Sequence, residues 1–133
     1  MFKNILIVGC GLIGSSILRA SIKKKISKKI YILEKSKNHI KQIKRLRLSC
    51  EILKDQKKQI PKVDMIIICT HLGEYLKIFN KIEKYINKNT IVTDVGSAKE
   101  NIFKKIKTKM KKNISWISSH PIAGSEVSGP VFG

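Results

Sequence analysis

The 133-residue sequence has few cysteines and no long hydrophobic run, and both scarcities narrow the classes of protein to which it can belong. Its three cysteines, Cys10, Cys50 and Cys69, lie far apart and lack the short spacing of metal ligands, so we expect no metal site. An odd, unpatterned set of this kind indicates reduced thiols in a cytoplasmic protein. The first apolar run, Ile5 to Val8, is too short for a signal-peptide core or a membrane span and favours a buried strand.

Acidic residues and arginines are also scarce. Nine Asp and Glu residues stand against 28 Lys and Arg residues, which gives a formal net charge of +19. Such a charge can indicate a nucleic-acid partner. However, the only arginines are Arg19, Arg45 and Arg47, whereas proteins that read grooves and phosphates favour arginine forks. The lysines are spread along the chain between isoleucines, so we expect them to fill solvated faces and do not favour nucleic acid as the partner.

Short apolar runs alternate with segments of helical periodicity along the whole chain. Hydrophobic residues make up 42% of it, and its length leaves room for one domain, residues 1–133. Strands are predicted over Lys3–Val8, Ile30–Leu33, Ser49–Leu53, Val63–Cys69, Thr90–Val95 and Ser115–Ser119. Helices are predicted over Leu12–Lys24, the basic stretch that contains Ile40, Ile43 and Leu46, Gly73–Ile86 and Ala98–Lys111. Pro61 is expected to break the chain, and a Gly/Pro/Ser loop follows the last strand.

This alternation predicts an α/β fold made of two β-α-β-α-β halves. Two such halves are typical of the Rossmann type, a doubly wound, mainly parallel sheet with strand order 3-2-1-4-5-6. Because the crossovers are right-handed, the carboxyl ends of the strands lie along one rim, where ligands bind.

A glycine-rich turn follows the first predicted strand and consists of Gly9, Cys10, Gly11, Leu12, Ile13 and Gly14. In a turn of this spacing, Gly9 permits the sharp bend and Gly11 lets the backbone approach a pyrophosphate. Gly14 allows the following helix to pack closely on the strand. The N–H groups at the start of that helix are unpaired and can bind the anion. The turn therefore predicts a dinucleotide site.

Glu34 ends the second predicted strand and lies 34 − 14 = 20 residues after Gly14, the spacing expected of a ribose-binding acidic residue. Its carboxylate can accept hydrogen bonds from the adenine-side ribose hydroxyls and repels a 2′-phosphate. We therefore expect NAD rather than NADP as the cofactor. Lys35 and Ser36 follow directly and weaken that preference.

Two further polar segments end the last two strands. Ser97 starts a Ser-x-x-Glu capping box with Glu100, which leaves its O–H free to donate a hydrogen bond. His120 is expected at the ligand rim, where Pro121 holds it in an extended backbone and a polar loop follows. These features favour a catalytic role for His120 over a structural one.

Together, four segments resemble the prephenate/arogenate dehydrogenase family. They are Gly-Cys-Gly-Leu-Ile-Gly-Ser (9–15), Val-Asp-Met-Ile-Ile-Ile-Cys-Thr (63–70), Thr-Asp-Val-Gly-Ser-Ala-Lys (93–99) and Ser-His-Pro-Ile-Ala-Gly-Ser-Glu (119–126). The first two occur in many dehydrogenases, whereas the last two are specific in this order and at this spacing. The resemblance covers essentially the whole chain, which corresponds to the N-terminal domain of the family.

The resemblance implies an oxidative decarboxylation in tyrosine biosynthesis, in which prephenate or arogenate loses a hydride to NAD⁺ and its ring carboxylate as CO₂. It implies that His120 polarises or deprotonates the substrate hydroxyl and that Ser97 orients both groups. The loop residues Gly124, Ser125 and Glu126 match the lining of the substrate pocket, and Thr70 matches the cofactor side. At 70–71 this chain has Thr-His where the family often has proline, and we expect His71 to be a variable rim residue.

The family continues into a helical domain that makes a homodimer and supplies much of the substrate pocket. We expect this chain to be a fragment that stops before that domain and to show little turnover alone. Two alternatives remain. Another Rossmann dehydrogenase, of the β-hydroxyacid type, would carry a catalytic lysine on a helix after this domain. A basic nucleotide- or nucleic-acid-binding module without catalysis would bind DNA or RNA with a steep salt dependence.

Overall fold

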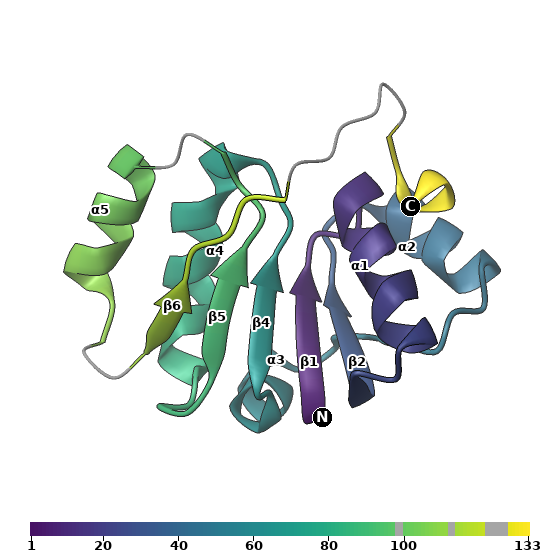
Figure 1. Cartoon of the computed structure of the whole chain (residues 1–133), viewed down its shortest axis with the longest axis horizontal. Helices are drawn as coiled ribbons and strands as arrows, with labels where there is room; N and C mark the ends of the chain where they lie inside the picture. Colours follow the sequence, from purple (N-terminus) through teal and green to yellow (C-terminus); the bar gives the residue numbers. More distant parts are fainter. Residues whose placement is uncertain (98–99, 112–113, 122–127) are drawn as a thin grey trace.

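Six strands form one parallel sheet in the computed structural model, which describes residues 1–97, 100–111, 114–121 and 128–133 (Figure 1). The sheet has the order β3-β2-β1-β4-β5-β6, and its five pairings are parallel. The predicted Rossmann-type strand order is therefore confirmed. The strands are β1 (Phe2–Val8), β2 (Ser27–Leu33), β3 (Glu51–Ile52), β4 (Met65–Ile68), β5 (Ile91–Asp94) and β6 (Ser115–Ile117).

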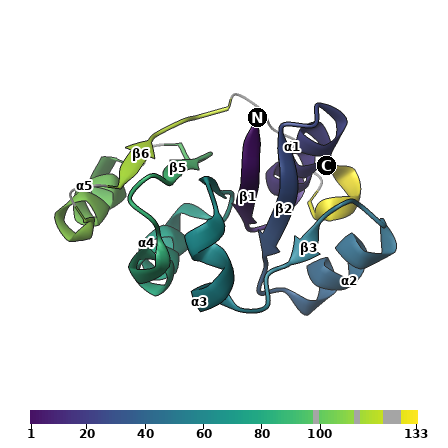
Figure 2. The same cartoon turned by 90° about the horizontal axis from the view of Figure 1, so that it is seen from below.

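Helices cover both faces of this sheet, and Figure 2 shows α1 and α4 on opposite sides of it. The α-helices are α1 (Leu12–Lys23), α2 (Lys37–Arg45), α3 (Gln56–Gln59), α4 (Tyr75–Ile82) and α5 (Glu100–Lys109). Short 3₁₀ turns cover Ile60–Lys62, Leu72–Glu74, Glu83–Tyr85 and Pro130–Phe132. Within the part of the chain that the structure describes, no helix combines the length and the apolar character needed to cross a bilayer.

The central strands are buried on both faces, so successive side chains of β1 enter two separate cores. Ile5 and Ile7 pack in one core with the buried residues of α1 and α2, Leu18 and Ile43. Leu6 and Val8 pack in the other core, to which α4 contributes Tyr75, Phe79 and Ile82 and α5 contributes Ile106. A strand covered on both faces is expected to be continuously apolar. This requirement explains the runs Ile5–Val8 and Ile66–Ile68, which are buried throughout.

Several predicted boundaries were wrong. Strand β2 begins at Ser27 rather than at Ile30, because Ser27 to Lys29 pair with β1 although the two lysines are exposed and show no hydrophobic pattern. The helix predicted over Gly73–Ile86 is divided into α4 and two flanking 3₁₀ turns. The sequence analysis also missed α3 and the turn Ile60–Lys62, in which Pro61 occupies one of the first positions, where no N–H is needed.

The stretch 128–133 is part of the Gly/Pro/Ser loop predicted after the last strand, and it packs against two helices. Its 3₁₀ turn Pro130–Phe132 lies beside α1 and α2, at the other end of the sheet from β6 (Figure 1). The guanidinium of Arg19 on α1 donates hydrogen bonds to the carbonyl oxygens of Pro130, at 2.9 Å, and Val131, at 3.4 Å. Gly129 enters the turn with φ of +91°, a conformation that favours glycine.

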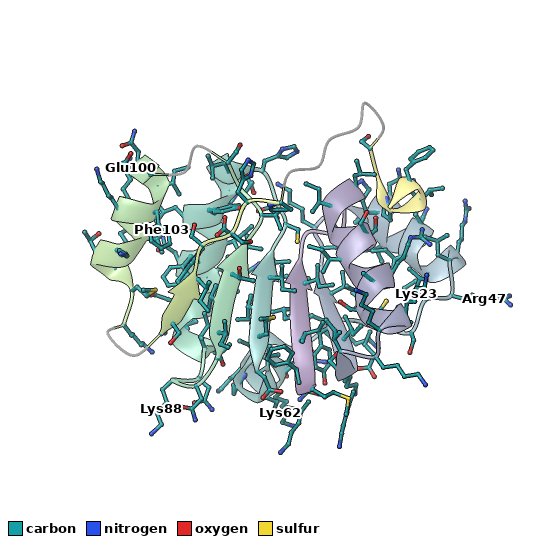
Figure 3. All side chains as sticks on the ribbon, viewed as in Figure 1. Lys23, Arg47, Lys62, Lys88, Glu100 and Phe103 are labelled. Atoms are coloured by element: carbon teal, nitrogen blue, oxygen red, sulfur yellow. The ribbon has the colours of Figure 1, made fainter. Side chains whose placement is uncertain are left out.

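Basic side chains lie on all sides of the molecule. The labelled cations of Figure 3 illustrate this: Lys62 and Lys88 lie near the amino ends of the strands, whereas Lys23 and Arg47 lie on the α1–α2 side. The net charge of +19 is therefore spread over the surface. Such a distribution raises the local potential for any anion and does not mark one binding face.

The core that α4 forms with β6 should dominate the stability of the second half of the sheet. Phe79 is fully buried, and its ring centroid lies 5.5 Å from that of Trp116. We expect Phe79→Ala to lower the free energy of unfolding by about 3–5 kcal/mol, since it leaves a cavity. The matched control is Phe132→Ala, because Phe132 is 61% exposed. Urea denaturation measures both; equal effects would contradict the assignment of Phe79 to the core.

Candidate functional site

A cavity of about 1180 Å³ opens at the carboxyl ends of the central strands. Its walls come from the segments that follow β1, β2, β4 and β5, and its outer lining includes Pro121, Ser128 and Phe132. In doubly wound sheets ligands bind in this crevice, where the strand order reverses between β1 and β4. The predicted site residues in its lining are Gly9, Gly11, Leu12, Ile13, Glu34, Thr70 and Ser97, and the expected rim residue His71 also lines it.

The glycine turn brings the start of α1 directly against the end of β1. A Cβ atom at Gly14 would lie 2.1 Å from the carbonyl oxygen of Gly9, so no larger residue fits there without a backbone shift. Gly9 has φ of +84°, and a Cβ on it would lie 2.6 Å from the methyl group of Thr70. Gly11 differs, since a Cβ there would meet no atom within 4 Å. Gly9 and Gly14 are thus required by the fold, whereas Gly11 faces open space.

The N-terminus of α1 has the features of an anion-binding site. Gly11 occupies the N-cap position, no side chain caps the helix, and its first turn has no acidic residue. The first N–H groups of a helix lack partners within the helix and carry partial positive charge. Close by, the hydroxyl oxygen of Thr70 is buried and has no hydrogen-bond partner among the described residues. The open space at Gly11, the uncapped helix and this hydroxyl fit a diphosphate.

Glu34 already has partners within the chain. One carboxylate oxygen accepts a hydrogen bond from the N–H of Cys10 and the other from the N–H of Ser36, both at 2.8 Å. His39 lies 3.4 Å from the first oxygen, and its side chain is 32% exposed. Burial raises the pKa of Glu34, but the two backbone hydrogen bonds and His39 outweigh it and hold that pKa below its usual value. Glu34 is thus a fixed negative charge that ties β2 to the glycine turn.

The cysteines near the cavity are not nucleophiles. Burial raises the pKa of Cys10 and of Cys69 to about 12, so both thiols stay protonated at neutral pH. The three cysteines are free thiols. Among the residues that the structure describes, no group of His, Cys, Asp and Glu side chains could hold a metal ion.

Ser97 and His120 end neighbouring strands on the same rim. Ser97 lines the cavity, and so does Pro121, whereas His120 is exposed and lies outside the lining. Two hydrogen bonds join the strand ends: the Ser119 hydroxyl donates to the main-chain oxygen of Asp94, and Thr93 donates to the oxygen of Ile117 at 2.7 Å. His120 therefore follows a strand end that is tied to β5, and it directly precedes Pro121, a lining residue.

Parts of the predicted site lie outside the described residues. Gly124, Ser125 and Glu126 fall within 122–127, and the capping box from Ser97 to Glu100 includes 98–99, which are also outside them. The structure therefore places Ser97 and His120 but not the substrate loop.

Asp94, for which no role was predicted, lies at the centre of this side of the rim. Its side chain is fully buried and accepts hydrogen bonds from the Gly96 N–H at 3.0 Å, the Tyr75 hydroxyl at 3.3 Å and the Trp116 indole N–H at 3.2 Å. Burial and then Asp94 itself raise the pKa of Tyr75, which stays protonated. Asp94 thus joins β5, α4 and β6 next to Ser97. A carboxylate that directly ends a buried strand, two residues before a glycine, was the available signal.

A crevice at the switch point of a parallel sheet, with an open glycine turn and a bare helix N-terminus beneath it, defines a nucleotide-binding domain of the Rossmann type. The family follows from the comparison with known proteins. A sequence model described as prephenate dehydrogenase, nucleotide-binding domain, matches residues 18–133, and the chain belongs to this family. The resemblance derived from the four segments is therefore confirmed.

Individual relatives agree with this assignment. The chain is 28% identical over 133 residues to a cyclohexadienyl dehydrogenase of Zymomonas mobilis and 30% identical over 129 residues to a prephenate dehydrogenase of Lactococcus lactis. Those matches cover 100% and 96% of this chain but 45% and 36% of the relatives, so the chain spans less than half of their length. A crystal structure of prephenate dehydrogenase from A. aeolicus with hydroxyphenyl propionate and NAD⁺ superposes with a TM-score of 0.86 at 25% identity, over 99% of this chain and 46% of that one.

The hydrogen bonds of Glu34 make its contribution to stability depend on pH. Because its pKa is lowered from 4.5, the stabilisation is fully present above that value and is lost as the pH falls through the lower folded-state pKa. We expect Glu34→Gln to lower the free energy of unfolding by about 1.5–3 kcal/mol at pH 7. The difference from the unaltered chain should shrink in acid, as measured by denaturation at several pH values.

Glu51→Gln is the matched control, since the Glu51 carboxylate is 52% exposed and pairs with Lys29 at the surface. It should change the free energy of unfolding by less than about 1 kcal/mol. A Glu34 effect that did not vary between pH 7 and pH 3 would contradict the role of its charge.

Proposed function

We propose that this chain is the cofactor domain of an NAD-dependent dehydrogenase that oxidatively decarboxylates prephenate or arogenate. The observation that carries the proposal is that the cofactor site and the predicted catalytic residues lie at the same edge of the sheet. The glycine turn and the bare start of α1 form a place for a dinucleotide, and Ser97 and His120 end the neighbouring strands. Membership of the prephenate dehydrogenase family supports this function.

The residues present fit the cofactor. In the proposed complex the N–H groups at Leu12 and Ile13 bind the diphosphate, and the absence of a side chain at Gly11 permits its close approach. The remaining acceptor capacity of the Glu34 carboxylate binds the ribose hydroxyls, since the oxygen that accepts from the Ser36 N–H can accept another donor. The Thr70 hydroxyl would gain a partner on the same side. Bound NAD⁺ supplies the hydride acceptor of the reaction.

The protein supplies position and a proton acceptor. In the proposed reaction the substrate C–H bond breaks with transfer of a hydride, the ring carboxylate leaves as CO₂, and the hydroxyl proton passes to the imidazole of His120. A neutral imidazole suits that task near neutral pH. Ser97, on the cavity wall, orients the imidazole and the substrate hydroxyl. Gly124, Ser125 and Glu126 are proposed to contact the substrate.

Since the chain spans less than half the length of its relatives, we propose that the homodimer and much of the substrate pocket depend on the helical domain of the family. Cationic groups for the substrate carboxylates would come from there. The chain alone should bind NAD⁺ and turn over poorly.

Cofactor binding can be tested on this chain directly. We expect Gly11→Ala to weaken NAD⁺ binding by about tenfold or more in a calorimetric titration, because its Cβ would occupy the space reserved for the diphosphate. The fold should tolerate the change, since φ is −75° and no atom lies within 4 Å of the added carbon. Gly73→Ala is the control: it is equally unobstructed but lies outside the cavity lining. Equal affinities for both variants would refute the proposed diphosphate site.

Catalysis requires the second domain, so we would join this chain to the remainder of the Zymomonas mobilis relative. With prephenate or arogenate, His120→Asn should lower turnover by about 10²–10⁴-fold, since the proton acceptor is lost. The affinity for NAD⁺ should stay within about twofold, because His120 lies outside the cofactor turn. Formation of NADH measures turnover. His71→Asn should retain activity, and full activity of His120→Asn would exclude its catalytic role.

A further inference from the structure

One ion pair bridges two walls of the cavity. Lys35 follows β2, Glu74 lies in the 3₁₀ turn before α4, and the Lys35 ammonium lies 2.9 Å from a carboxylate oxygen of Glu74. Both residues line the cavity. Among the ion pairs of the described residues, it is the one whose two partners both belong to that lining. The pair therefore lies where a dinucleotide would enter between the segments after β2 and β4.

The charges at this end of the cavity differ in how freely they can move. Glu34 is 7% exposed and held by the N–H groups of Cys10 and Ser36, so its negative charge is fixed. The Lys35 side chain is 79% exposed, and its long aliphatic stem can carry the ammonium to different partners. The Glu74 side chain is 30% exposed and therefore less free. Lys35 is thus the movable charge, and Glu74 determines where it rests.

This arrangement bears on the choice between the two nicotinamide dinucleotides, which differ by a phosphate on the adenine-side ribose. That phosphate would approach Glu34, which repels it, and would need a nearby cation. Lys35 is adjacent to Glu34 in the chain, but in this structure its ammonium is bound to Glu74. A 2′-phosphate must therefore compete with Glu74 for Lys35, whereas a free 2′-hydroxyl needs no cation.

We propose that Glu74 is a specificity-determining residue, which holds Lys35 away from a 2′-phosphate and so favours NAD⁺ over NADP⁺. The proposal rests on the dinucleotide site described under the proposed function. The charge of Glu34 by itself repels the 2′-phosphate of NADP⁺. The Lys35–Glu74 pair explains why a lysine directly after Glu34 does not cancel that repulsion.

The test is Glu74→Gln, with NAD⁺ and NADP⁺ each titrated into the unaltered chain and the variant by calorimetry at low ionic strength. The glutamine keeps the size of the side chain and removes its charge. We expect the affinity for NADP⁺ relative to NAD⁺ to rise by about three- to tenfold, as Lys35 is released. The increase should fade as salt is added, because the interaction is between exposed charges.

Two further variants identify the source of the effect. Glu51→Gln removes the same charge from an ion pair of the same length, Lys29–Glu51 at 2.9 Å, outside the cavity, and should leave the ratio unchanged. In Lys35→Gln/Glu74→Gln the gain should vanish. If it persisted, the neighbouring residues Lys77 and His71, which also interact with Glu74, would be responsible and the proposal would be overturned.

The outcomes separate this inference from the function on which it rests. If NAD⁺ binds to the unaltered chain and Glu74→Gln leaves the ratio of affinities unchanged, the role of Glu74 is refuted and the dinucleotide site stands. If NAD⁺ does not bind to the unaltered chain, the dinucleotide site is refuted and the role of Glu74 with it.

Discussion

The contact between Gly14 and the carbonyl oxygen of Gly9 is the constraint on which the cofactor side of this protein depends. Because Gly14 has no side chain, the first turn of α1 can pack directly against the end of β1. The free N–H groups of the helix then point to the rim of the sheet. The Glu34 carboxylate then fastens the same turn to β2 through the N–H of Cys10. The anion site is therefore built from backbone, and its position is set by packing rather than by the side chains that surround it.

A second constraint organises the reaction side. Burying the Asp94 carboxylate is tolerable only because its partners come from several elements: the Gly96 N–H, the Tyr75 hydroxyl on α4 and the Trp116 indole on β6. These bonds fix the ends of β5 and β6 relative to each other, and Ser97 and His120 continue directly from those ends. The two halves of the sheet thus carry separate tasks, and they meet at the switch point between β1 and β4.

The sequence predicted the parts of this structure that arise from local patterns. The apolar runs of the strands predicted the strand order, and the glycine spacing predicted the cofactor turn. A strand buried on both faces and a Gly-x-Gly-x-x-Gly bend each produce a recognisable pattern within a few residues. The polar start of β2 shows no such pattern, since Ser27 and Lys29 pair with β1 through their backbone and Lys28 and Lys29 expose their side chains. The Lys35–Glu74 pair joins residues 39 positions apart, and the contact of Arg19 with Pro130 spans 111. Such contacts depend on the assembled fold and could not be predicted from spacing.

The attachment of the stretch 128–133 to α1 has an evolutionary consequence. Arg19 recognises main-chain carbonyl oxygens, which every amino acid presents, so the exposed side chain at 131 can change without loss of the anchor, whereas Pro130 is buried. Arginine offers several donors in a fixed fork, and a lysine could not reproduce that geometry. Gly133 is under the opposite pressure, since a Cβ there would collide with Ser15 and with the backbone nitrogen of Ser16. Divergence in this stretch should therefore be uneven, with a permissive position at 131 and a restricted one at 133.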